Sequence, residues 1–131
     1  MKTYQQLVAE AKAQVKEVDV ATLLSVLNQQ NTVVIDIREP EEYQQGHIEN
    51  VVNYPRGVLE SKMCQHPCVQ HHAEPMAALE DMGNKSVYLI CRSGARTALA
   101  AQSLHDMGFS DVISVAGGML AWEESGYPVE K

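Results

Sequence analysis

The residues that could do chemistry gather in one short run, Cys-Arg-Ser-Gly-Ala-Arg, at positions 91–96. An ionised cysteine is a nucleophile, and the two arginines of the run, Arg92 and Arg96, favour the thiolate over the thiol. A loop of small residues ahead of a helix can also turn successive backbone N–H groups toward an anion. The run therefore predicts a nucleophilic Cys91 beside a small anionic substrate, with arginines able to form forked hydrogen bonds to its oxygens.

The elements around this run would place Cys91 at the tip of a buried strand. The apolar stretch 86–90 precedes it, and a helical pattern closed by Gly108 follows it. Further strands are indicated at 17–20, 32–37, 50–55 and 111–115, and helices at 20–30, 39–48, 75–82 and 117–126. Alternating strands and helices predict an α/β fold with a mostly parallel sheet and helices on both faces. Ligands of such sheets bind at the carboxyl ends of the strands, which is where Cys91 falls.

The chain divides into an N-terminal extension, residues 1–17, and one domain, residues 18–131. Apolar residues at four-residue spacing, Leu7, Ala11 and Val15, predict an amphipathic helix over residues 3–16. This helix could pack on its own domain or against a second copy of the chain. The 114 residues that follow suffice for a single hydrophobic core.

Composition excludes several classes of function. A net charge of −7 argues against general binding of nucleic acid, because phosphate contacts need a cationic surface. No apolar stretch is long enough to span a membrane, and the first residues lack the pattern of a secretory signal, so a cytoplasmic location is the default expectation. Three cysteines is an odd number, which in a reducing compartment leaves free thiols for chemistry.

Three segments in order resemble the signatures of rhodanese-like domains: VVIDIREPEEYQQGHIENVVNYP, CRSGAR and VISVAGGMLAWEESGYPV. The resemblance implies a three-layer domain with a five-stranded parallel sheet, and a sulfurtransferase that needs no metal or organic cofactor. Cys91 would take sulfur from a small anionic donor such as thiosulfate, become a persulfide, and pass the sulfur to cyanide or another thiophilic acceptor, which could be a protein. The substrate-binding residues would be those of the loop, through their backbone N–H groups and the two guanidinium groups: Arg92, Ser93, Gly94, Ala95 and Arg96.

Two alternatives are weighed against this interpretation. Related cysteine-dependent phosphatases have five residues between the cysteine and the arginine, whereas four separate Cys91 from Arg96, so the loop favours sulfur transfer. The loop also differs from the threonine-ended loop of mercaptopyruvate sulfurtransferases, which makes thiosulfate the better donor. The other alternative is a non-catalytic or sulfur-carrier module that docks on a sulfur-trafficking or redox partner.

The remaining polar residues of these motifs have structural explanations. Asp36 and Arg38 are expected to form an ion pair or a helix cap, ahead of a role in shaping the active-site loop. Glu39 and Glu42 are expected to be solvated charges, and His47 a packed turn histidine. Gly117, Gly118 and Trp122 are interpreted as residues of the fold. One segment, CQHPCVQHH, lies outside the family pattern, and its potential ligands are Cys64, Cys68, His66, His71 and His72. A variable surface loop is the favoured interpretation there, ahead of a resolving thiol or a metal site.

Overall fold

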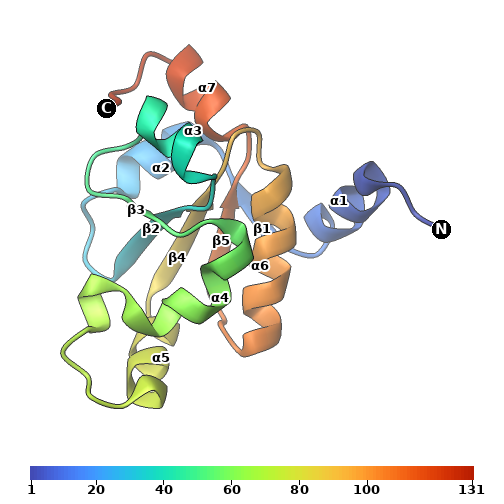
Figure 1. Ribbon diagram of the computed structural model, residues 1–131. Coiled ribbons are helices and arrows are strands. Elements are labelled where there is room, and N and C mark those ends of the chain that lie inside the picture. The colour runs from blue at the N-terminus through green and yellow to red at the C-terminus, as the bar shows by residue number, and fades with distance from the viewer.

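Five parallel strands form one sheet in the computed structural model, which describes residues 1–131 (Figure 1). The strands are β1 (Lys16–Val18), β2 (Thr32–Asp36), β3 (Val52–Asn53), β4 (Ser86–Ile90) and β5 (Val112–Val115), in the order β1-β5-β4-β2-β3. β2 and β4 pair along their whole length, from Thr32 opposite Ser86 to Asp36 opposite Ile90. The predicted α/β class with a five-stranded, mostly parallel sheet is confirmed.

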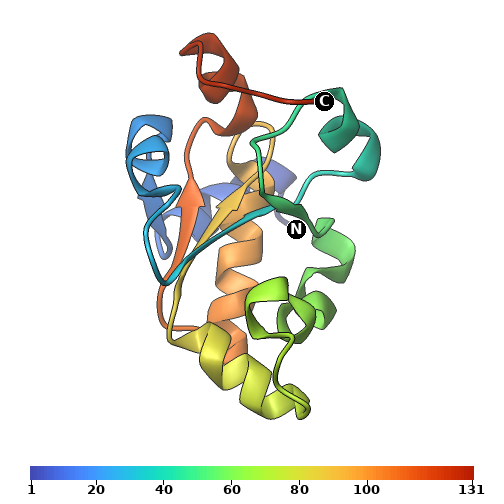
Figure 2. The ribbon, with the colours of Figure 1, turned by 90° about the vertical axis from the view of Figure 1, so that its left-hand side faces the viewer.

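Helices cover both faces of the sheet, as Figures 1 and 2 show together. The α-helices are α1 (Tyr4–Lys12), α2 (Val20–Val26), α3 (Pro40–Gln45), α4 (Leu59–Lys62), α5 (Pro75–Gly83), α6 (Ala95–Met107) and α7 (Gly118–Glu124). Three single turns of 3-10 helix, η1 (Arg56–Val58), η2 (Met63–Gln65) and η3 (Pro67–Val69), lie around α4 and ahead of α5. None of the helices is long and apolar enough to cross a membrane.

Two hydrophobic clusters hold the layers together. The larger one joins α4, α5 and α6 to one face of the sheet and includes Val33, Ile35 and Leu89. The smaller one joins α2 and α7 to the other face and includes Val34 and Ile90. Successive residues of β2 and β4 thus enter opposite clusters, which explains why both strands read as continuous apolar runs rather than as alternating ones.

The N-terminal helix α1 packs in cis against α6. Thr3 and Gln6 form a capping box that begins α1. The helix ends at Lys12, so the predicted helix over residues 3–16 is too long at its C-terminal end, and Val15 lies outside α1. Val8 and Ala11 are buried, and the side chain of Gln102 on α6 donates to that of Gln14 over 2.9 Å. The extension therefore covers one side of the helix that follows the Cys91 loop.

Candidate active site

Cys91 directly follows β4, and its side chain is buried, with 1% of its surface exposed. Helix α6 starts at Ala95, so the chain must reverse within three residues. Gly94 makes this turn with φ +99°, a left-handed conformation that favours glycine. Its backbone N–H donates to Cys91 Sγ over 3.2 Å. The predicted arrangement of strand, loop and helix thus brings one amide directly onto the sulfur.

The other amides of the loop have no acceptor within the protein. The backbone N–H groups of Arg92, Ser93, Ala95 and Arg96 make no hydrogen bond to a backbone or side-chain atom. They lie at the N-terminus of a 13-residue helix, where donors are unpaired and the helix dipole favours negative charge. The loop that follows Cys91 therefore offers a set of unpaired hydrogen-bond donors.

A buried hydroxyl pair completes the surroundings of the sulfur. Thr97 Oγ1 lies 3.6 Å from Cys91 Sγ, and the hydroxyl of Ser114 on β5 donates to the same Thr97 oxygen over 2.7 Å. Both residues are fully buried. The sequence analysis missed them, although Ser114 is the one polar residue in the apolar strand VISV and was therefore a detectable signal.

Arg96 does not face the sulfur as an unpaired cation. Its guanidinium forms two hydrogen bonds with the carboxylate of Glu42 on α3, at 2.7 and 2.9 Å. The hydrogen bonds from Arg96 hold the pKa of Glu42 at about 2, and the carboxylate in turn raises the pKa of Arg96. Glu42, which the sequence suggested was a solvated charge, anchors one end of the loop. Arg92 is exposed and forms no ion pair, so its charge is available at the carboxyl-terminal edge of the sheet, which we call the rim.

Helix α7 holds the carbonyl side of the loop. The N–H groups of Met119 and Leu120 donate to the carbonyl oxygens of Cys91 and Arg92 at 2.8 and 3.0 Å. Gly118, the first residue of α7, has φ +52°, and a Cβ there would lie 2.4 Å from the Cys91 oxygen. Gly118 is thus a residue of the fold, as expected, but its place in the fold is against the backbone of Cys91.

The Asp36 and Arg38 pair is buried beneath the same rim. Arg38 donates to both carboxylate oxygens of Asp36 and to the carbonyl oxygen of Gly46, at distances of 2.8 to 3.1 Å. Their side chains are 1% and 8% exposed. The expected structural ion pair is present, and it fixes the turn that ends α3 close to Glu42.

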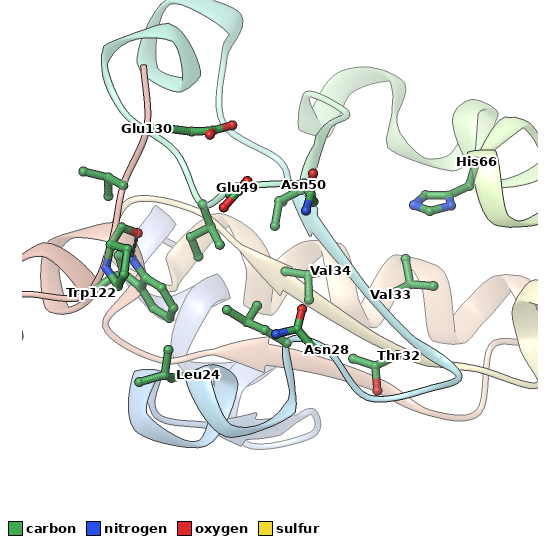
Figure 3. Close-up of a pocket in the computed structure, with 15 residues that line it drawn as sticks. Leu24, Asn28, Thr32, Val33, Val34, Glu49, Asn50, His66, Trp122 and Glu130 are labelled. Carbon is green, nitrogen blue, oxygen red and sulfur yellow. Dashed lines mark hydrogen bonds between the residues drawn. The ribbon is translucent and has the colours of Figure 1, made fainter.

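Two cavities differ in their relation to the loop. One, of about 340 Å³, lies at the rim beside the loop and is lined by Arg38, Glu42, Gln45, Gly46, Arg92, Met119, Leu120 and Glu123. Another, of about 300 Å³, runs from Trp122 past β2 to His66 and contains no residue of the 91–96 loop (Figure 3). The first cavity adjoins the loop through Arg92, whereas Cys91 itself lines neither cavity.

The segment CQHPCVQHH lies at the surface, where it forms parts of the two 3-10 turns η2 and η3, and these turns anchor it to the domain. Its neighbour Met63 and its own Val69 are fully buried in the larger cluster, and Cys64 and Cys68 pack against that cluster. All three cysteines are free thiols. The structure brings none of the segment's ligands together with Cys91.

The protein is thus an α/β protein with a buried cysteine at the end of a central parallel strand and unpaired amides at the start of the following helix. The family model of the rhodanese-like domain matches residues 19–125. The chain belongs to the rhodanese family, as its three motifs suggested.

Two of the chain's relatives carry names from sulfur chemistry. The chain is 30% identical to the thiosulfate sulfurtransferase GlpE of Pseudoalteromonas translucida, across 82% of this chain and 89% of that protein. It is 36% identical to a Bacillus subtilis protein with the name sulfur carrier protein YrkF, across 68% of this chain but only 40% of the relative's length. A solved structure from Rhodopseudomonas palustris, described as a protein of unknown function and possible tyrosine phosphatase, has a TM-score of 0.80 at 28% identity. That match covers 99% of this chain and 96% of the other.

Proposed function

We propose that this protein is a sulfurtransferase that moves sulfane sulfur from thiosulfate, or a similar small anion, to a thiophilic acceptor through a persulfide of Cys91. The observation that carries the proposal is the amide of Gly94 directed at Cys91 Sγ over 3.2 Å, within a loop whose other amides are unpaired. Such donors stabilise an anionic sulfur before and after it accepts a second sulfur atom. The name of the relative GlpE supports thiosulfate as the donor.

The reaction would proceed as a double displacement. The Cys91 thiolate attacks the outer sulfur of thiosulfate, a new S–S bond forms, and the old S–S bond breaks with its electron pair leaving on sulfite. The outer sulfur of the persulfide then carries the negative charge, and the amides of Arg92, Ser93, Ala95 and Arg96 would bind it. Attack by cyanide on that sulfur gives thiocyanate and returns the Cys91 thiolate.

The two arginines would have separate tasks. Arg92 is exposed beside the rim cavity and would bind the oxygens of the donor. Arg96 is committed to Glu42 and would fix the loop, so that its amide rather than its guanidinium meets the substrate. This differs from a phosphatase, in which the arginine of the loop must be free to bind phosphate.

Mass spectrometry of the intact protein after thiosulfate treatment tests the proposal. We expect an adduct of about 32 Da that maps to Cys91 and is absent from Cys91→Ser, because one sulfur atom is held covalently. Cyanide should remove the adduct with release of thiocyanate. A free, alkylatable Cys91 that never acquires the adduct would contradict the proposal, as would hydrolysis of p-nitrophenyl phosphate in place of sulfur transfer.

The name of the relative YrkF favours a second candidate, a sulfur carrier that hands its persulfide to a protein acceptor. Both candidates predict the adduct on Cys91. They differ in turnover, since a carrier would keep its sulfur when cyanide is added and release it only to a partner. Steady-state thiocyanate production separates the two.

A further inference from the structure

The segment from η2 to α5 divides its potential ligands into two groups, one packed within the domain and one near the surface. Cys64 and Cys68 are partly buried against the hydrophobic core, and Cys68 Sγ lies 3.5 Å from Met82 Sδ. His66 accepts a hydrogen bond from the backbone N–H of Cys68 through its Nδ1. These three residues are thus already engaged within the domain. The two remaining histidines, His71 and His72, lie at the surface.

His71 and His72 converge on one carboxylate oxygen. His72 Nε2 lies 2.9 Å from Asp81 Oδ2, and His71 Nε2 lies 3.9 Å from the same atom. The two imidazole rings are 4.2 Å apart, and one ligand atom from each of the three residues lies within 4.8 Å of the others. Lys85 pairs with the other oxygen of Asp81, Oδ1, at 3.5 Å. Asp81 Oδ2 therefore faces the two histidines, whereas Oδ1 faces Lys85.

Only His72 forms a hydrogen bond with Asp81 Oδ2, whereas His71 Nε2 lies 3.9 Å from that oxygen and its side chain forms no hydrogen bond. A neutral imidazole has one N–H and one lone pair, and each carboxylate oxygen has two lone pairs, so Asp81 Oδ2 can bind a cation that both rings also bind. Two protonated rings in contact would repel each other. A divalent cation between the three groups would satisfy both nitrogen lone pairs and the oxygen at once.

We propose that His71, His72 and Asp81 bind one divalent transition-metal ion of the Zn²⁺ type, with water as the fourth ligand. Imidazole and carboxylate are ordinary zinc ligands, and three protein ligands with an open fourth position is a common arrangement. Tetrahedral bonds of about 2.0–2.2 Å place the ligand atoms roughly 3.4 Å from one another. His71 Nε2 must therefore approach Asp81 Oδ2 from 3.9 Å, and His72 Nε2 must move away from it from 2.9 Å. The side chain of His71 is 66% exposed and is free to rotate inward.

The metal site lies at the opposite end of β4 from Cys91. Helix α5 directly precedes β4 and Cys91 directly follows it, so a five-residue strand of about 16 Å separates the two ends. In Figure 1, α5 lies at the bottom of the sheet and the loop between β4 and α6 at the top. The ion would connect the turn after η3 to α5 without touching the reacting sulfur, and its effect would be on the stability of this segment.

Cobalt and zinc titrations of the full chain test the site. Isothermal titration with Zn²⁺ should give one equivalent per chain, and Co²⁺ should give visible d–d bands without the near-ultraviolet band of a sulfur ligand. We expect His71→Asn, His72→Asn and Asp81→Asn each to weaken zinc binding at least tenfold. Zinc should raise the melting temperature of the wild type in a concentration-dependent manner, because it binds only the folded state.

Matched variants separate this site from other ligands. His105→Asn removes an exposed imidazole on α6 and should leave the titration unchanged, as should Cys64→Ser/Cys68→Ser. Weak, non-saturating uptake by the wild type would overturn the proposal. So would stoichiometric binding that survives the His71→Asn/His72→Asn double variant, or a cobalt spectrum with a sulfur band. His71 is exposed, so its variant tests the proposal even if the Asp81 variant fails to fold.

Discussion

The hydroxyl of Ser114 donates to the hydroxyl oxygen of Thr97 over 2.7 Å, and that same oxygen lies 3.6 Å from the sulfur of Cys91. Because Thr97 Oγ1 accepts a hydrogen bond from Ser114, the hydroxyl hydrogen of Thr97 is free to point at the Cys91 sulfur. A buried O–H donor stabilises its acceptor most when the acceptor is charged. Ser114 on β5 therefore orients the hydroxyl of Thr97 on α6. That hydroxyl can stabilise the thiolate and the persulfide of Cys91 that the proposed reaction requires.

Replacing Thr97 by valine should slow the formation of the persulfide by about tenfold, because a hydrogen bond to a charged group contributes about 1.5–3 kcal/mol. Thr97→Ser keeps the hydroxyl and should stay near the wild-type rate. Ser114→Ala leaves the Thr97 hydroxyl in place but free to turn, so a smaller decrease is expected. Stopped-flow measurement of sulfite release gives the rate, and a wild-type rate in folded Thr97→Val would refute this role.

The exposed guanidinium of Arg92 should decide the affinity for the donor. We expect Arg92→Ala to lower kcat/KM for thiosulfate by about tenfold, mostly through KM, since a charge-assisted hydrogen bond of about 1.5 kcal/mol is lost. Arg56→Ala removes another exposed arginine and serves as the control. Steady-state kinetics with varied thiosulfate makes the measurement. Equal effects of the two substitutions would mean that only net charge matters.

The ion pair of Glu42 with Arg96 should make stability depend on pH. Hydrogen bonds from Arg96 lower the pKa of Glu42 from its ordinary value of 4.5 to about 2. A lowered pKa in the folded state adds stability that is fully present above pH 4.5 and is lost as the pH falls from there toward 2. The Glu42 side chain is 31% exposed, so solvent screening reduces the contribution to about 1 kcal/mol.

Urea denaturation of the wild type and Glu42→Gln across this pH range measures that contribution. The difference between their free energies of unfolding should be about 1 kcal/mol at neutral pH and should shrink as Glu42 becomes protonated. Glu41→Gln removes an unpaired carboxylate from the same helix and is the matched control. A difference that does not change with pH would show that the charge of Glu42 is not responsible.

The sequence allowed the fold and the position of Cys91 to be predicted because their signals are local. Continuous β-branched runs mark buried parallel strands, and Gly94 followed by a helical pattern marks the turn after Cys91. The partner of Arg96 has no such signal, since Glu42 lies 54 positions away and its own neighbours read as a solvated helix. Only the sheet order, which sets α3 beside the start of α6, brings the two together.

Contacts that only the tertiary fold creates also explain why the sequence did not show how the ligands around Cys68 are grouped. Its cysteines and histidines are adjacent in the sequence, which suggested one set of potential ligands. The 3-10 turns η2 and η3 direct the thiols inward and leave His71 and His72 beside Asp81 of the following helix. Side-chain direction in irregular segments depends on tertiary packing, so residue spacing alone could not have separated the two groups.

Removing Arg38 should destabilise the domain severely. Arg38→Met leaves the carboxylate of Asp36 buried without its partner, and breaking such a pair costs about 3–5 kcal/mol. The double variant Asp36→Asn/Arg38→Met removes both charges and should recover part of that loss. Urea denaturation gives the free energies of unfolding. If the double variant were less stable than Arg38→Met, the unpaired charge would not be the cause.

Gly118 should be required for the position of the Cys91 loop because of its close contact with that loop, in addition to its left-handed backbone conformation. Gly118 and Gly126 both have positive φ, +52° and +76°, so alanine at either position meets a backbone strain of about 1 kcal/mol. Only at Gly118 would the added Cβ meet the loop, 2.4 Å from the Cys91 oxygen, whereas nothing lies within 4 Å at Gly126. The difference between the two alanine variants therefore isolates the contact with the loop.

We expect Gly126→Ala to lose about 1 kcal/mol of stability and to form the persulfide at the wild-type rate, because its strain stays local. Gly118→Ala must also push the Cys91 carbonyl away from the amide of Met119, which adds about 1–3 kcal/mol as for other overpacked sites. That movement shifts the sulfur relative to the amide of Gly94, so persulfide formation should fall as well. Chemical denaturation and single-turnover sulfite release measure the two effects. Equal losses of stability and equal rates in both variants would mean that α7 does not hold the loop, and that the amides near Cys91 keep their geometry without it.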